Sequence, residues 1–390
     1  MGFLSGTASF QRFWVTKDPT PALGPDHIKK LKKFQIGQLD KAATDEPNVG
    51  FIAGAHLLDT NFAIEKNIMG DALHFGVRVD TDQIPAAIKN AWLQMELLPL
   101  TVDNPGGKPT KSQREEAKEM VEARCEEEAA TGKFRRMSQV SVLWDASNEQ
   151  IYVGSTSSSA SEVVIGLLER AFEIEVEPVT SGKLALNYAT EYELIEDLYE
   201  ISPSVFVAEQ APGVTWWNGM ANNYDYVGNE FLLWLWWSFA ANGDAISLHD
   251  ESEVSGMFAR TLTLDCPQGE FGKETISAIS PVALPEAVLA IQSGKLPRKA
   301  GLTLIRHDHQ YDLTLQAETF SVGSGKITAL GDQGDVDSHD RIKSIQEFSE
   351  TLDLLFDAFC ERRIGKNWKG ELKKIQEWLE SEKPLRRRAA

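Results

Sequence analysis

The 390-residue sequence has few cysteines and no long apolar run. Its three cysteines, Cys125, Cys266 and Cys360, lie far apart and form no Cys-x-x-Cys pair, so we expect neither a disulfide framework nor a zinc site. The longest apolar run, 231–239, is far shorter than the ~20 residues of a membrane-spanning helix. No basic segment followed by an apolar stretch opens the chain, so no secretory signal is expected. These absences predict a cytoplasmic protein without a membrane partner.

The short motifs of common catalytic sites are also absent, including GxxxxGK[ST], GxSxG, HExxH and a GxGxxG that follows a strand. His307-Asp308-His309 could place two imidazoles on one side of a strand, or form a two-residue tip between strands. Glu116 with Lys118, and Glu371 with Lys373, have a carboxylate–lysine spacing found in metal-dependent nucleases, but on helices typical of solvated surfaces. We therefore predict no catalytic residue, metal or cofactor, with a Mg²⁺-dependent nuclease as the enzymatic alternative.

Acidic residues dominate the charge, which is -19 overall. Phosphate binding needs local positive charge, so this total argues against a protein that coats nucleic acid. Two segments are nevertheless basic: 27–41 has five lysines and one aspartate, and 361–390 has ten basic and five acidic residues. Separate basic patches within an acidic exterior are compatible with nucleic acid held at one surface, and equally with ordinary solubility charge.

Hydrophobic periodicity alternates between strand and helix patterns, which predicts an α+β fold. Predicted strands are 9–15, 72–79, 140–145, 150–154, 259–264, 301–305 and 311–320, and predicted helices are 26–36, 84–98, 159–171, 230–240 and 285–291. We divide the chain into a central αβ domain (1–100 and 138–200), a helical tip (101–137), a tryptophan-rich and β-rich second αβ domain (201–330) and a C-terminal helical segment (341–385), which follows a linker at 331–340.

The segment 111–130 is almost devoid of large apolar residues. A helix this polar cannot be a core helix, so we expect it to project into solvent or reach a partner. It is followed by Lys133-Phe134-Arg135-Arg136, an aromatic residue among three cations. Such a group can stack on bases while the cations hold phosphates. Alternatively, Phe134 is the hydrophobic stop between a helix and a strand.

Two further features have both a binding and a structural interpretation. Five tryptophans fall within 22 positions: Trp216, Trp217, Trp234, Trp236 and Trp237. They could form a stacking surface or dock a protein partner, but the segment 230–240 is apolar on all sides, which favours a core or subunit-interface helix. Lys295, Arg298 and Lys299 lie in a predicted loop, 294–300, which could meet phosphate or be a plain surface turn.

In order and spacing, several segments resemble the recombination-associated protein RdgC family, in particular a longer branch of RdgC-like proteins. The resemblance is carried by 111–114, 133–139, 143–145, 150–154, 159–171, 290–295 and 299–302, and the features of the longer branch are 50–54, 71–75 and 233–236. It implies a horseshoe-shaped subunit with mixed or antiparallel sheets, a projecting helical tip and a C-terminal helix.

The resemblance also implies the function. Two subunits would close into a ring around double-stranded DNA without sequence preference, in the nucleoid, and limit assembly of recombinase filaments. The predicted DNA-binding residues are Lys108, Lys111, Lys133, Phe134, Arg135, Arg136, Lys295, Arg298 and Lys299. One family contact is missing, because Ala278-Ile279-Ser280 stands where the family has a lysine-glutamine step. The tryptophan-rich region and the extra C-terminal helix have no clear equivalent in classical members.

Overall fold

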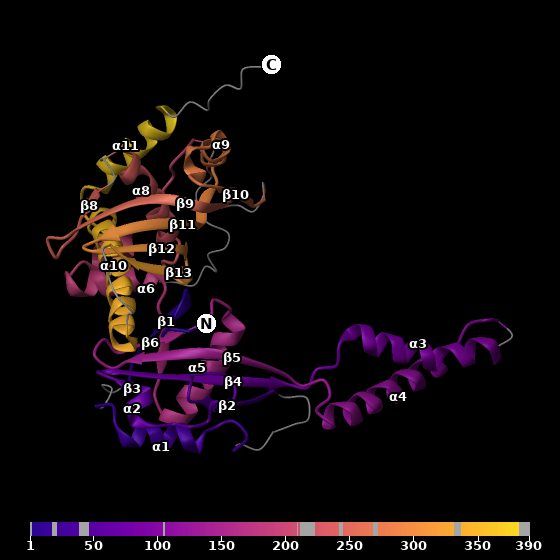
Figure 1. Cartoon of the computed structure of the whole chain (residues 1–390). Helices are drawn as coiled ribbons and strands as arrows, with labels where there is room; N and C mark the ends of the chain where they lie inside the picture. The colour runs from indigo at the N-terminus through magenta and orange to yellow at the C-terminus, as the bar shows by residue number, and fades with distance from the viewer. Residues whose placement is uncertain are drawn as a thin grey trace.

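One open antiparallel sheet runs through the whole body of the protein (Figure 1). The computed structural model describes residues 2–17, 22–38, 47–103, 106–208, 210, 223–241, 245–267, 272–330 and 337–381. Within these residues the sheet has 13 strands, and its named strands all pair antiparallel. The fold is therefore α+β, as predicted, with an antiparallel rather than a mixed sheet.

The strand order along the sheet is β10 (Glu274–Ala278), β9 (Glu253–Asp265), β11 (Leu296–Arg306), β12 (His309–Gln316), β13 (Val322–Ala329), β1 (Ala8–Val15), β6 (Gln150–Val153), β5 (Arg136–Asp145), β4 (Ala72–Thr81) and β2 (Asn48–Ile52). Three short strands pair beside this path: β3 (Ile68–Met69), β7 (Val176–Pro178) and β8 (Ala245–Ser247). Strand β1 joins two half-sheets, because Ala8 and Phe10 pair with β13 whereas Gln11 to Trp14 pair with β6.

The helices of the body are α1 (Pro25–Lys33), α2 (Ile64–Asn67), α5 (Ser158–Phe172), α6 (Ser181–Glu191), α7 (Ile195–Glu200), α8 (Val227–Ala241), α9 (Pro285–Gln292), α10 (Ser338–Ile364) and α11 (Trp368–Ser381), with a 3₁₀ turn at Pro281–Ala283. In the half-sheet that contains β4, the side chains of Leu73, Phe75 and Val77 pack with those of α1 and α5. Because side chains alternate along a strand, His74 and Gly76 face the opposite side.

Helix α8 is the buried helix of the other half-sheet. Its Trp234, Trp236 and Trp237 are all buried and pack in one core with residues of β9, β11, α10 and α11. The interpretation of 230–240 as a core helix is thus confirmed, and these three rings offer no surface to a partner or a base. Trp216 and Trp217 lie outside the described residues.

Within the predicted C-terminal helical segment the structure describes two helices, α10 and α11, separated at Gly365. A Cβ atom at Gly365 would lie 2.4 Å from the carbonyl oxygen of Glu361, so the turn between the two helices requires glycine at this position. The predicted loop 294–300 is largely strand, because Leu296 and Pro297 already pair with β9.

Buried ion pairs connect distant parts of the chain. The Nη1 and Nη2 atoms of Arg12 in β1 each donate to the Asp353 carboxylate of α10 over 2.6 Å. Arg363 of α10 pairs with Glu230 of α8, and both side chains are buried. The carboxylate of Glu230 also accepts from the amide of Ser204 at 2.7 Å, which attaches the 202–206 segment to the same pair. Charge pairing therefore fixes α10 to both half-sheets.

Asp357 of α10 differs from these carboxylates, because no described residue donates a hydrogen bond to it or forms an ion pair with it. Burial, reinforced by the charges of Asp353 and Glu191, raises the pKa of Asp357 to about 7. Between the unfolded-state pKa near ~4 and this value, the folded protein holds a proton that the unfolded chain has lost. The contribution of Asp357 to stability therefore falls as the pH rises through this window.

We expect Asp357→Asn to stabilise the protein more at pH 8 than at pH 5, by about 1–2 kcal/mol in the free energy of unfolding. Urea denaturation at the two pH values measures the difference. Asp340→Asn, an exposed aspartate in the first turn of the same helix, is the matched control. An equal effect of Asp357→Asn at both pH values would show that its carboxyl group titrates alike in the folded and unfolded states.

Candidate nucleic-acid interface

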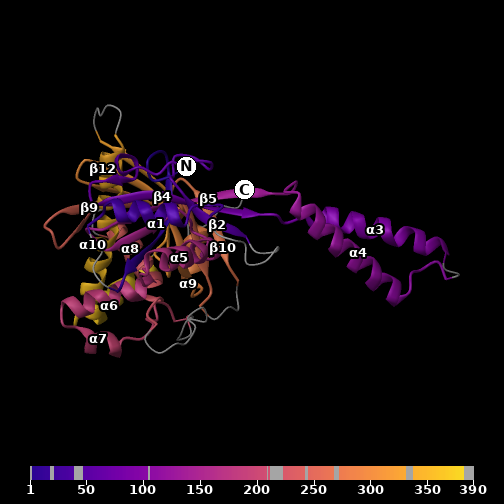
Figure 2. The same cartoon turned by 90° about the horizontal axis from the view of Figure 1, so that it is seen from below.

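A helical hairpin projects from the sheet between β4 and β5 (Figures 1 and 2). It consists of α3 (Ala86–Asp103) and α4 (Lys111–Ala130), and we call residues 82–135 the arm. The prediction that 111–130 is a projecting helix is confirmed. The arm begins earlier than the predicted tip at 101, because α3 packs on α4 and not on the central sheet.

A small apolar core holds the two helices of the arm together. Ile84, Trp92 and Val121 are buried in it. The guanidinium of Arg124 lies over the Trp92 ring, 4.5 Å from the ring centre, and adds a cation–π contact. The start of α4 is fixed by a capping box, in which Thr110 Oγ1 accepts from the Gln113 amide and Gln113 Oε1 accepts from the Thr110 amide. The arm is thus a preformed unit with its own core.

Phe134 belongs to this core and does not stand free. Its ring is half-buried and meets the Trp92 ring edge-to-face, with the ring centres 6.4 Å apart. Lys133 Nζ lies 5.6 Å from the centre of the Phe134 ring. This placement agrees with Phe134 as a hydrophobic stop between helix and strand. Its role as a finger against DNA stays a prediction.

The predicted cations of the arm lie toward its two ends, and Lys118 and Arg124 of α4 lie between them. Lys108 and Lys111 are exposed at the far end, and Lys111 Nζ lies 4.0 Å from Glu115. At the base, Lys133 lies 3.5 Å from Glu128, and Arg135 Nε donates to Asp82 at 3.1 Å. Arg136 is exposed, opposite Thr81 in the β4–β5 ladder. Because α4 has 20 residues, the two groups are about 30 Å apart.

The three cations predicted in the second domain lie on or next to β11, away from the arm. Lys295 is only 4% exposed and forms an ion pair with Glu274. Arg298 Nε donates to Glu318 at 2.7 Å, and its Nη1 lies 3.4 Å from Asp265. Lys299 is exposed. Lys295 and Arg298 are therefore engaged in the body of the protein, which leaves Lys299 as the exposed charge of the three.

The six predicted residues of 108–136 thus lie at the far end and at the base of the arm, and the other three lie on a separate half-sheet. The arm and the β10 edge lie on the same side of the body in both views (Figures 1 and 2). No pattern in the sequence predicts a role for four polar residues on β4, β5 and the loop after β2, which are His56, His74, Gln139 and Ser141. His74 lies in 71–75 and Gln139 in 133–139, two segments that the sequence singles out only for the family resemblance.

In the described part of the chain, no group of three or more His, Cys, Asp or Glu side chains could hold a metal ion. The metal-binding and nuclease alternatives therefore gain no support from these residues. His307 and Asp308 form the two-residue tip of the β11–β12 hairpin, which confirms the simpler interpretation of that motif. Among the described residues, none of the helices combines the length and hydropathy that crossing a bilayer requires.

No protein-family model matches the chain, and no curated protein sequence matches it.

Proposed function

We propose that this protein binds double-stranded DNA without sequence preference, as a dimer of horseshoe-shaped subunits whose arms help to close a ring, and that it limits assembly of recombinase filaments. The observation that carries the proposal is the arm itself. It projects from the body at its base alone (Figure 2) and has exposed cations at both ends. A helical hairpin that projects in this way presents its outer surfaces to another molecule.

The outer face of α3 supports the dimer. One side of α3 packs on α4, while Ala87, Ala91, Met95 and Leu98 are exposed at helical spacing on another side. Met95 is 62% and Leu98 is 69% exposed. An apolar stripe on a projecting element marks an interaction site, and the arm of a second copy presents the same stripe. Arm-to-arm contact would bury both.

The charge distribution supports a duplex near the arm. The protein as a whole has a charge of -19, so DNA would be held only where exposed cations lie close together. Lys108, Lys111 and Arg114 at the far end, and Arg136 at the base, are exposed cations separated by a glutamate-rich stretch of α4. Phosphates would therefore be held at two places along each arm and at Lys299, with no contact to base edges and hence no sequence preference.

We expect Lys111→Ala and Arg136→Ala each to reduce the slope of log K against log salt concentration by about 0.9, since each removes one phosphate contact. Fluorescence anisotropy with a labelled 30-base-pair duplex between low and moderate salt measures the slope. Lys29→Ala is the matched control, because Lys29 is exposed and ion-paired but lies on α1, outside the arm. Slopes that stay unchanged in both arm variants would contradict the proposed contacts.

A further inference from the structure

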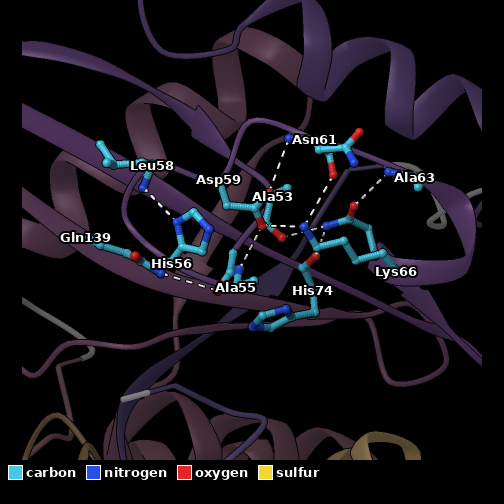
Figure 3. Close-up of polar contacts among 12 residues, drawn as sticks. Ala53, Ala55, His56, Leu58, Asp59, Asn61, Ala63, Lys66, His74 and Gln139 are labelled. Carbon is cyan, nitrogen blue, oxygen red and sulfur yellow. Dashed lines mark hydrogen bonds and ion pairs between the residues drawn. The ribbon is translucent and has the colours of Figure 1, made fainter.

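A pocket of about 290 Å³ lies between the chain start, the loop after β2 and the strands β4 and β5. Its lining contains histidine, glutamine, serine, glycine and small apolar residues, and no Asp, Glu, Lys or Arg: Gly2, Leu4, Ser5, Gly54, Ala55, His56, His74, Gln139 and Ser141. Figure 3 shows His56, His74 and Gln139 around the loop that begins at Ala53. The pocket thus has polar but uncharged walls.

The polar groups of the floor have unused hydrogen-bonding capacity. His74 is 3% exposed and Ser141 is 8% exposed, yet no described residue forms a hydrogen bond with the imidazole of His74 or the hydroxyl of Ser141. Gln139 Nε2 donates to the carbonyl of Gly54 at 3.4 Å, which leaves its Oε1 as an acceptor. None of these atoms is among the buried side-chain atoms without a partner in the described residues, so they are accessible from the pocket, where water or a ligand can pair with them.

The two histidines have different hydrogen-bonding roles. Burial lowers the pKa of His74 to about 4, so its ring is neutral and offers one donor and one acceptor. His56 Nδ1 accepts from the amide of Leu58 at 3.2 Å. The Nε2 atom is therefore the polar atom of the His56 ring that can meet a ligand. The pocket is therefore suited to an organic ligand.

The loop that carries His56 is held rigidly above the floor (Figure 3). Asp59 accepts from the amides of Ala55 and Asn61 and pairs with Lys66. Asn67 is fully buried, and its Nδ2 donates to the carbonyls of both Ala53 and His74, at 2.9 and 2.7 Å.

Gly54 closes the contact between this loop and the floor, because its φ is +97° and a Cβ atom there would lie 2.9 Å from His74 Cε1. The pocket is thus preorganised, which reduces the entropy lost on binding.

We propose that this pocket binds an uncharged nucleobase, either as a free nucleoside or as an unpaired base of DNA. Imidazole rings can stack on a flat heterocycle, and glutamine amides and serine hydroxyls pair with the donors and acceptors of base edges. Along β5, Gln139 and Arg136 are three residues apart, about 10 Å, with their side chains on opposite faces of the sheet. The link to DNA rests on the proposed function.

Titration of the full-length protein with adenosine, guanosine, cytidine and thymidine, followed by isothermal calorimetry, tests the pocket. We expect saturable binding of at least one nucleoside with little dependence on salt, since the ligand is uncharged. The double variant Gln139→Leu/Ser141→Ala should weaken it about tenfold or more, because it removes two hydrogen-bonding partners. Ser138→Ala, on the other face of β5, should leave it unchanged. Thermal unfolding shows whether the double variant is folded.

A second arm compares a fully paired duplex with the same duplex that contains one unpaired base. Tighter binding of the second DNA, lost in Gln139→Leu/Ser141→Ala, identifies the ligand as an unpaired base. Nucleoside binding without that preference identifies a free nucleoside. The pocket proposal is overturned if neither is observed, or if the double variant binds both as the parent does. If the parent protein binds a nucleoside but shows no salt-dependent binding of duplex DNA, the proposed function is overturned and the pocket proposal stands.

Discussion

Replacing Arg363 by alanine is expected to lower the free energy of unfolding by about 3–5 kcal/mol. Arg363 and Glu230 are only 4% and 1% exposed, and the Arg363 Nη2 atom also donates to the carbonyl of Ser202 at 2.6 Å. Without Arg363, the Glu230 carboxylate has no described cation beside it and stays in the core between α8 and α10. A charge left alone in a dry interior costs far more than the pair contributed.

Urea denaturation measures this effect, and Arg362→Ala provides the matched control. Arg362 is the preceding residue on α10 but is exposed, so its loss should change stability by no more than about 0.5 kcal/mol. Combining Arg363→Ala with Glu230→Gln should restore part of the loss, since the uncompensated charge is then absent. If Arg363→Ala destabilised no more than Arg362→Ala, the buried pair would not be the reason that α8 and α10 stay together.

Removing the arm is expected to convert the protein to a monomer and to weaken duplex binding at least about 100-fold at moderate salt, because several phosphate contacts are lost at once. Thr81 and Arg136 are paired opposite each other in β4 and β5. A two-residue Asn-Gly turn can therefore replace residues 82–135 and close the two strands as an ordinary hairpin. The body should keep its fold, since the arm core is separate from the two sheet cores.

Light scattering and fluorescence anisotropy measure the two outcomes, and circular dichroism reports the fold of the armless body. Leu98→Glu separates the two roles of the arm: it places a charge in the apolar stripe of α3 but keeps every cation. We expect it to weaken the dimer while each remaining monomer retains most of its salt-dependent binding. An armless protein that still dimerises and binds duplex DNA as the parent does would refute the proposed use of the arm.

Local patterns predicted the elements of this fold well. The amphipathic period over 159–171 became α5 (Ser158–Phe172), and the two apolar strands around 146–149 became the β5–β6 hairpin. The polar composition of 111–130 predicted a projecting helix, which is α4. In each case the deciding interactions are between residues near in sequence, or the residue types themselves fix which face meets water.

Contacts between distant residues escaped the same reasoning. The sequence predicts Lys295 in a loop, but the β9–β10 hairpin places Glu274 beside it and its side chain is buried. Helix 84–98 was assigned to the central domain, yet Trp92 finds its partners on α4 and at Phe134. The pocket around His74 combines three segments, 2–5, 54–56 and the β4–β5 pair, so that no single stretch of sequence contains its pattern.

The position of β1 has a consequence for how the chain is made. Ala8 pairs with Gly325, and the partner of Arg12 in its ion pair is Asp353, which is 341 residues later. A ribosome therefore releases the first strand long before either partner exists. Since closure of such long loops slows folding, the Ala8–Phe10 end of β1 must stay unpaired through most of translation, whereas Gln11 to Trp14 can pair with β6 much earlier. The half-sheet of β1, β2, β4, β5 and β6 can form early, but the two halves can join only after β13 has been synthesised.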